Sequence, residues 1–296
     1  MPEHTYFEAR ERALLGARYD EVYRPQGEVR RALTRNALRC SEARFLQLMG
    51  PSVCRAPFCA DSFYLLDETV RPGKSPLYHA GAYYVQEASA AAPAPLLDVQ
   101  PGQRVLDMCA APGGKTAVMS EMMGDTGRVY AWDTHAHRVE LIRGTINRLK
   151  LENVRPAVKD ASVPREEMAM TLDAALVDVP CSGTGVMNEK PDVKYRVTEE
   201  GVQALCRTQK DILDAVAPMV KVGGTLVYST CSILPQENEA QIKAFLERHP
   251  EYEVWPMGAE LPEKLAAHEN ACGLQMFAHR DGTDGFYVCR MRRVKA

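Results

Sequence analysis

The sequence has no long uncharged apolar run, although 46% of its 296 residues are hydrophobic. A membrane-spanning helix needs about 20 consecutive apolar residues, so we expect a soluble globular protein with a sizeable core. The first residues also lack the basic and then apolar pattern of a secretory signal. The length allows one large domain, or a main domain with a smaller one.

The nine cysteines include no Cys-x-x-Cys pair, and their number is odd. Disulfide frameworks and structural zinc sites use paired, closely spaced cysteines. We therefore expect reduced thiols in a cytoplasmic protein, without a metal site. Six of the cysteines are expected to be ordinary packing residues: Cys40, Cys54, Cys59, Cys206, Cys272 and Cys289.

An excess of positive charge, the usual mark of a nucleic-acid-binding domain, is also missing, because the formal net charge is −3. The basic residues are nevertheless clustered in an arm within residues 29–60 and a tail after the last acid, Asp284: Arg30, Arg31, Arg35, Arg39, Arg44, Arg55, and Arg290, Arg292, Arg293, Lys295. The arm and the tail are predicted to bind phosphates. A solvated helix face explains the arm equally well.

The pattern of predicted helices and strands differs between roughly the first 100 residues and the rest of the chain. Residues 6–15 and 29–34 have apolar positions at helical spacing, residues 63–66 favour a short strand, and the Ala/Pro-rich residues 88–95 are predicted to be a linker. From about residue 103, strands and helices alternate: strands at 104–108, 128–133, 154–159, 174–179 and 225–229, and helices at 115–123, 135–149, 199–220 and 236–248. This alternation predicts an α/β fold with a mostly parallel sheet and helices on both faces. A last strand at 285–291 is expected as an antiparallel edge.

Three acids, Asp107, Asp133 and Asp160, end successive predicted strands at spacings of 26 and 27 residues. The Gly113-Gly114 turn after the first strand lets backbone approach a ligand, and the next helix begins with free N–H groups. A carboxylate at the second strand end is placed to accept ribose hydroxyls, and Asp160 to bind an exocyclic amine.

The turn itself matches neither common nucleotide motif. It lacks the G-x-G-x-x-G of dinucleotide oxidoreductases, and Cys109 stands where a P-loop requires glycine. An ordinary tight turn is the plain alternative. A nucleoside cofactor without a pyrophosphate, S-adenosylmethionine, fits best.

Two cysteine corners, Pro180-Cys181 and Thr230-Cys231, end neighbouring strand-like runs, so both thiols are expected at the carboxyl edge of the sheet. A thiolate that adds to carbon 6 of a pyrimidine makes carbon 5 nucleophilic toward a methyl sulfonium. A base must later remove the carbon-5 proton. Lys115 or the helix start near Pro235 is expected to activate the thiolate. The alternative is that both cysteines are buried packing residues.

At these residues the chain resembles the Sun-domain family of RNA cytosine-5 methyltransferases, which includes bacterial small-subunit rRNA methyltransferases. The matching segments lie within about residues 29–292: 83–89, Asp107-Met108-Cys109-Ala110-Ala111-Pro112-Gly113-Gly114-Lys115-Thr116, Asp178-Val179-Pro180-Cys181-Ser182-Gly183-Thr184-Gly185 and Tyr228-Ser229-Thr230-Cys231-Ser232. The resemblance implies a Rossmann-like methyltransferase domain at 96–296 and a small N-terminal α+β RNA-binding region at 1–95.

The resemblance also implies residue roles. Cys231 attacks carbon 6, Cys181 assists release of the methylated base, and Asp178 contacts the flipped cytosine, as does Lys115. The implied S-adenosylmethionine pocket comprises Cys109, Ala110, Ala111, Pro112, Gly113, Gly114, Lys115, Asp133, Arg138, Asp160 and Asp178.

Substrate and class alternatives remain open at this stage. DNA cytosine-5 methyltransferases use the Pro-Cys cysteine instead, so Thr230-Cys231 favours RNA, with rRNA ahead of tRNA. Val179 departs from the family's usual alanine and is expected to narrow the base pocket. An amino-group methyltransferase would have an Asn/Asp-Pro-Pro-aromatic corner at Asp178, which is absent. A non-catalytic RNA-binding or ribosome-assembly factor would not need two exposed thiols.

Overall fold

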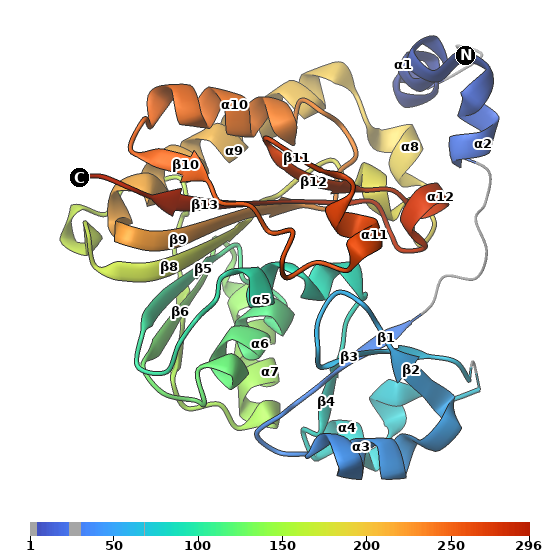
Figure 1. The fold of residues 1–296 in the computed structure, drawn as a ribbon, viewed down its shortest axis with the longest axis vertical. Coiled ribbons are helices and arrows are strands. Elements are labelled where there is room, and N and C mark those ends of the chain that lie inside the picture. Colours follow the sequence, from blue (N-terminus) through green and yellow to red (C-terminus); the bar gives the residue numbers. More distant parts are fainter. Residues whose placement is uncertain (1–4, 24–30, 68) are drawn as a thin grey trace.

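A nine-stranded sheet forms the centre of the computed structural model, which describes residues 5–23, 31–67 and 69–296 (Figure 1). Its strand order is β11-β12-β13-β9-β8-β5-β6-β7, and β10 pairs with β13. Five strands run parallel: β5 (Arg104–Met108), β6 (Arg128–Asp133), β7 (Val154–Val158), β8 (Leu172–Asp178) and β9 (Val220–Thr230). The α/β fold predicted from the alternation is confirmed.

The last long strand, β13 (Phe286–Arg293), pairs antiparallel with β9, as predicted, but it is not an edge. It carries β12 and β10 on its other side, and β11 continues the sheet beyond β12: β10 (Tyr252–Val254), β11 (Glu269–Asn270) and β12 (Gly273–Met276). These additional strands are short, so their sequences give little periodic signal.

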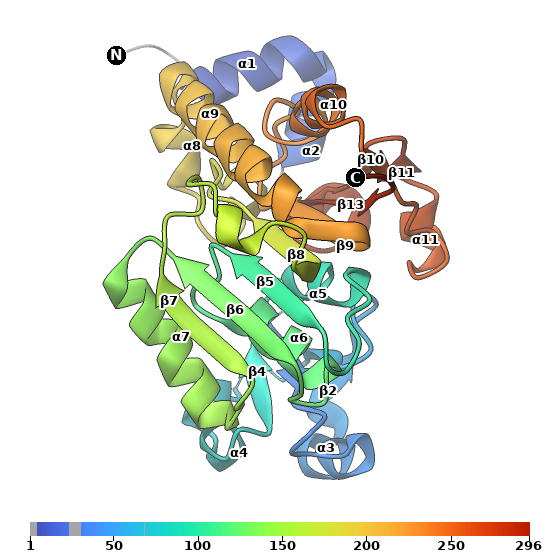
Figure 2. The ribbon, with the colours of Figure 1, turned by 90° about the vertical axis from the view of Figure 1, so that its left-hand side faces the viewer.

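Helices cover both faces of this sheet because successive strand residues point to opposite sides (Figure 2). Val105 belongs to the core beneath α5 (Pro93–Leu96), α6 (Gly114–Met122) and α7 (Ala136–Leu149). Leu106 belongs to the opposite core, beneath α9 (Glu199–Val216) and α10 (Glu239–Arg248). Each buried aliphatic side chain of this kind contributes about 1.5–3 kcal/mol.

A separate antiparallel sheet has the order β2-β3-β1-β4: β1 (Ala32–Arg35), β2 (Val53–Arg55), β3 (Ser62–Leu65) and β4 (Tyr83–Val85). The helix predicted at 29–34 is wrong where the structure describes it, because all four β1 residues are buried between neighbouring strands; Val29 and Arg30 lie outside the described residues. Helix α3 (Glu42–Met49) places Phe45 against Phe63, with ring centroids 5.0 Å apart.

The predicted linker at 88–95 is also wrong. It forms a 3₁₀ turn, Ser89–Ala91, and the start of α5, and Ala88, Ala92 and Ala94 are buried in the main core. Small side chains allow these turns to pack closely against α6. The low polarity of residues 88–95 therefore reflects two short buried helical segments, Ser89–Ala91 and α5.

The first two helices, α1 (Tyr6–Leu15) and α2 (Tyr19–Tyr23), lie beside α8 (Val193–Arg196) and α12 (Ala278–Asp281), away from the small sheet (Figure 1). The helix predicted at 6–15 is confirmed, and Thr5 with Glu8 forms its capping box. Phe7 packs in a cluster with Val197, Val202 and Leu234. The N-terminal segment thus covers the main domain near the end of β9.

Much of the predicted basic arm and tail is used internally. Arg35 is buried and pairs with Asp61, and Arg55 pairs with Glu42. Arg290, only 2% exposed, lies 4.1 Å over the Trp255 ring and pairs with Glu260, and Arg293 donates to backbone carbonyls. The guanidinium groups of Arg35, Arg290 and Arg293 are buried and not available to bind phosphates, so the prediction was wrong for these three. Arg39, Arg44, Arg55, Arg292 and Lys295 are exposed.

None of the helices built by the described residues is both long and apolar enough to span a membrane.

Candidate active site and cofactor cavity

The two cysteine corners meet at the carboxyl edge of the sheet. Strands β8 and β9 are parallel neighbours with Asp178 opposite Ser229, so the loops that follow them begin side by side. The Sγ atoms of Cys181 and Cys231 are 3.1 Å apart, and all nine cysteines are free thiols. The alternative of two unrelated packing cysteines does not fit this contact.

The surroundings of the two sulfurs are not equivalent. A hydrogen bond from Cys181 lowers the pKa of Cys231 below its ordinary value, with help from Lys115 and against burial and Asp178. The same bond, burial and the Glu237 carboxylate raise the pKa of Cys181 well above that of an ordinary thiol. Cys231 is therefore the sulfur that ionises first, and the thiolate is the nucleophilic form.

Lys115 and Asp178 form an ion pair beside the thiols, with Nζ 2.9 Å from Oδ2. The Ser229 hydroxyl donates to the other oxygen of Asp178 at 2.6 Å, which fixes the carboxylate. Burial acts to lower the pKa of Lys115, but the pairing with Asp178 outweighs it and keeps the pKa above that of an ordinary lysine. The site thus holds a permanent cation next to the more acidic thiol.

A buried carboxylate, Glu237, joins the two cysteine loops. Its Oε1 accepts hydrogen bonds from the Ser182 backbone N–H (2.8 Å) and the Gln209 side chain (3.0 Å). Its Oε2 accepts from the hydroxyls of Ser182 and Ser232, each at 2.5 Å. Ser182 follows Cys181 and Ser232 follows Cys231, so one side chain sets the distance between the loops that carry the sulfurs.

A cavity of about 230 Å³ opens next to Lys115 and Asp178. It is lined by the turn after β5 and by the end of β4: Tyr84, Val85, Gln86, Ala90, Asp107, Cys109, Ala110, Ala111, Pro112, Gly114, Lys115 and Asp178. Gly113 has a φ of 101° and precedes α6, a left-handed conformation that glycine adopts without strain. At Gly114 a Cβ would lie 2.6 Å from the Tyr84 ring, so this turn also requires the absence of a side chain.

The cavity contains acceptors that no protein group satisfies. Asp107, 1% exposed, accepts from Thr116 at 2.5 Å through one oxygen, while its other oxygen and the Gln86 Oε1 have no hydrogen-bond partner. Burial raises the pKa of Asp107 to about 7. Buried polar atoms without partners are costly unless a ligand binds them, so these positions fit a ligand that carries hydroxyl or amino groups.

The other predicted cofactor residues lie around this turn. Asp133, 2% exposed, ends β6; its Oδ2 accepts no hydrogen bond, although Arg138 Nε lies 3.4 Å away. Arg138 also donates to the Ala111 carbonyl at 3.2 Å and so ties β6 to the glycine turn. Asp160 differs from Asp133 in being exposed, and it accepts hydrogen bonds from Ser162. The cavity lining includes none of Gly113, Asp133, Arg138 and Asp160.

Glu237, Ser229 and Tyr84 are site residues that the sequence did not indicate. Ser229 lies one position before the Thr-Cys corner, and Tyr84 lies in a segment quoted only for its resemblance. Glu237 lies at the predicted start of a helix, where an acid is usually read as a helix-end charge. Its role depends on hydrogen bonds to residues 55 and 28 positions away, which no local pattern reveals.

Comparisons with known proteins agree with this architecture. The sequence model of the family described as 16S rRNA methyltransferase RsmB/F matches residues 94–292, and that of the N-terminal domain of 16S rRNA methyltransferase RsmF matches residues 4–88. A probable ribosomal RNA small subunit methyltransferase B from Synechocystis is 39% identical over 220 residues, covering 74% of this chain and 49% of the relative.

Two further relatives extend the comparison. Ribosomal RNA small subunit methyltransferase F from Escherichia coli is 34% identical over 280 residues, covering 92% of this chain and 58% of the relative. The structure of a methyltransferase homolog from Pyrococcus horikoshii has a TM-score of 0.79 and 28% identity, covering 96% of this chain and 93% of that one. The chain thus spans 49% to 58% of the length of these curated relatives.

Proposed function

Because the chain belongs to the RsmB/F family of methyltransferases, we propose that it transfers a methyl group from S-adenosylmethionine to carbon 5 of a cytosine in RNA. The observation that carries the proposal is the thiol pair, 3.1 Å apart, beside the Lys115–Asp178 pair and the cavity with unsatisfied acceptors. The relatives named as small-subunit rRNA methyltransferases favour rRNA over tRNA. Nine reduced cysteines support a cytoplasmic setting.

In the proposed reaction the target cytosine leaves its stack and enters the site, at a cost of a few kcal/mol. The Cys231 thiolate forms a bond to carbon 6, and the displaced ring electrons make carbon 5 nucleophilic. Bound S-adenosylmethionine supplies the methyl group. A base then takes the carbon-5 proton, the electron pair of that C–H bond forms the carbon 5–carbon 6 double bond, and the bond to Cys231 breaks to release its thiolate. Cys181 assists this step, because its thiol already hydrogen-bonds the departing sulfur.

Asp178 and Lys115 are proposed to bind the ring, since their ion pair lies beside the thiols with Phe286 5.7 Å from the Lys115 ammonium. The glycine turn, Asp107, Asp133, Arg138 and Asp160 are proposed to bind the cofactor. We also propose that residues 96–296 form the methyltransferase domain and that residues 1–95 contact RNA, with exposed Arg39 and Arg44 supplying positive charge for this contact.

The proposal is tested by methylation of RNA from cells that lack this protein, with labelled S-adenosylmethionine. The RNA is fractionated by species and digested to nucleosides. Label in 5-methylcytidine from one rRNA or tRNA band supports the proposal and identifies the substrate. Measurable cofactor binding without label in any RNA, small-subunit assembly intermediates included, contradicts it and favours a non-catalytic RNA-binding factor.

Replacing Asp133 is expected to weaken cofactor binding. Hydrogen bonds to a charged group contribute about 1.5–3 kcal/mol, so Asp133→Asn should raise the Kd for S-adenosylmethionine by about 10- to 100-fold in isothermal titration. Glu140→Gln on α7, which has a 71% exposed side chain, is the matched control and should leave the Kd unchanged. Equal Kd values for Asp133→Asn and the wild type would exclude Asp133 from the pocket.

Replacing Glu237 is expected to disturb the alignment of the two thiols. An amide in Glu237→Gln keeps the size of the side chain but brings a donor against groups that already donate. We expect kcat to fall about 10-fold or more, with the KM for S-adenosylmethionine little changed. Glu247→Gln, exposed on α10, the helix that follows Glu237, is the control. A rise in that KM with kcat unchanged would show that Glu237 does not position the thiols.

A further inference from the structure

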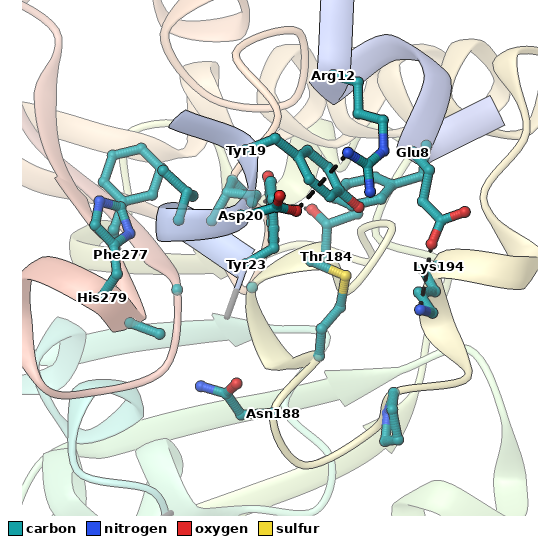
Figure 3. A pocket seen from close by; sticks show the side chains of 18 residues that line it. Glu8, Arg12, Tyr19, Asp20, Tyr23, Thr184, Asn188, Lys194, Phe277 and His279 are labelled. Atoms are coloured by element: carbon teal, nitrogen blue, oxygen red, sulfur yellow. Dashed lines mark hydrogen bonds and ion pairs between the residues drawn. The ribbon is translucent and has the colours of Figure 1, made fainter. Parts of the chain in front are cut away.

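A second cavity has a volume of about 660 Å³, and Thr184, Gly185 and Ile233, from the loops that follow Cys181 and Cys231, are among its lining residues. Figure 3 shows the side chains that line it. Its walls come from α1 and α2, from the segment 184–194, and from α12 with Phe277. None of its lining residues is shared with the proposed cofactor cavity. It therefore is a separate site, closed on one side by the N-terminal helices.

This cavity is joined to the thiols by backbone hydrogen bonds. Gly185, in its wall, donates to the Cys231 carbonyl at 2.9 Å and accepts from Gly285 at 2.9 Å. A Cβ on Gly185 would lie 1.9 Å from the Gly285 oxygen, so the three backbones meet too closely for any side chain. Ile233, also in the wall, donates to Thr184 at 3.1 Å. These hydrogen bonds thus attach the cavity floor to the loops that follow Cys181 and Cys231.

Aromatic rings and neutral polar groups line the cavity. Tyr19 and Tyr23 face it from α2, with ring centroids 4.9 Å apart, while Phe277 and His279 come from the opposite side (Figure 3). Burial, followed by the nearby Arg280, lowers the pKa of His279, so its ring is uncharged near neutral pH. Asn188 adds an amide at the opening.

The charges of the cavity are balanced within it. Arg12 lies 3.7 Å from Asp20, and Lys194 lies 3.3 Å from Glu8. A phosphate would require an excess of positive charge, which these pairs do not provide. A flat, uncharged, hydrogen-bonding group suits the cavity better, and aromatic side chains stack on bases of any sequence.

We propose that this cavity binds the nucleobase of an unpaired RNA nucleotide next to the target cytosine on the same strand. The inference rests on the proposed function, because the target base occupies the site of the two thiols. The proposal gives α1 and α2 a role in substrate specificity, because they complete the cavity that binds the base next to the target cytosine. Sequence-specific RNA recognition commonly uses such splayed, stacked bases.

The test uses the RNA segment that the wild-type protein methylates, prepared with an abasic site at either flanking position. Loss of one flanking base should reduce kcat/KM about 10-fold or more, and His279→Ala should remove most of that dependence. His268→Ala, outside the cavity, should retain it. Photo-crosslinking with 4-thiouridine at the same position should label residues 19–23 or 277–279.

The outcomes separate the two proposals. If the wild-type protein methylates no RNA, so that no such segment can be prepared, the proposed function itself is contradicted. Methylation of intact and abasic segments at equal rates, or crosslinks confined to the small sheet, overturns the neighbour pocket and leaves the methyltransferase proposal standing.

Discussion

A Cys231→Ala variant is expected to transfer no measurable methyl group to RNA. Removal of a covalent nucleophile typically lowers turnover by about 10⁴- to 10⁶-fold. The neighbouring thiol, Cys181, cannot replace Cys231 as the nucleophile, because its pKa is raised well above that of an ordinary thiol. The pKa of Cys231 is lowered by the hydrogen bond from Cys181 and by Lys115. The measurement is incorporation of labelled methyl into the RNA species that the wild-type protein modifies.

Two controls make the Cys231 result specific. Cys206→Ala removes another half-buried thiol, on α9, and should leave the rate within about twofold of the wild type, because its sulfur donates to the Gln236 carbonyl at 3.4 Å and does not bond the Cys181–Cys231 pair. S-adenosylmethionine should bind Cys231→Ala normally, since Cys231 is not a cavity residue. Residual activity in Cys231→Ala together with none in Cys181→Ala would reverse the assignment of the nucleophile.

The sequence predicted the regularly alternating strands and helices of the main sheet well. The strands at 104–108 and 128–133 are found with the predicted bounds, because strands that are buried on both faces of the sheet leave a nearly continuous apolar run in the sequence. The proximity of Cys181 and Cys231 was also predictable, because neighbouring parallel strands end at the same edge of the sheet.

The failures have a common cause, which is burial that local patterns do not reveal. Residues 29–34 are predicted to be helical from the spacing of their apolar side chains, yet the pairing of residues 32–34 with β3 and β4 makes this part a strand. Arg35 and Arg290 read as phosphate ligands, but each finds a carboxylate partner far along the chain. No sequence pattern indicated the role of Glu237, since this role depends on hydrogen bonds to two loops that are brought together only by the fold.

A Cys181→Ala variant is expected to accumulate a covalent protein–RNA adduct. The variant keeps the Cys231 nucleophile and the Lys115 cation, so attack on carbon 6 and methyl transfer still proceed. It lacks the thiol that hydrogen-bonds the Cys231 sulfur as that sulfur departs. Adduct release should therefore become the slow step, and a band retarded in denaturing gels, sensitive to ribonuclease, should appear only when S-adenosylmethionine is present.

The double variant decides what the adduct is. Cys181→Ala combined with Cys231→Ala should form no band, because the bond to RNA requires the Cys231 sulfur. Loss of Cys181 also removes the hydrogen bond that lowers the pKa of Cys231, so adduct formation in the single variant should need a higher pH than wild-type turnover does. An adduct that persists in the double variant would place the covalent bond on another residue. Absence of any adduct in Cys181→Ala, with turnover near the wild-type rate, would show that Cys231 leaves without the help of its neighbour.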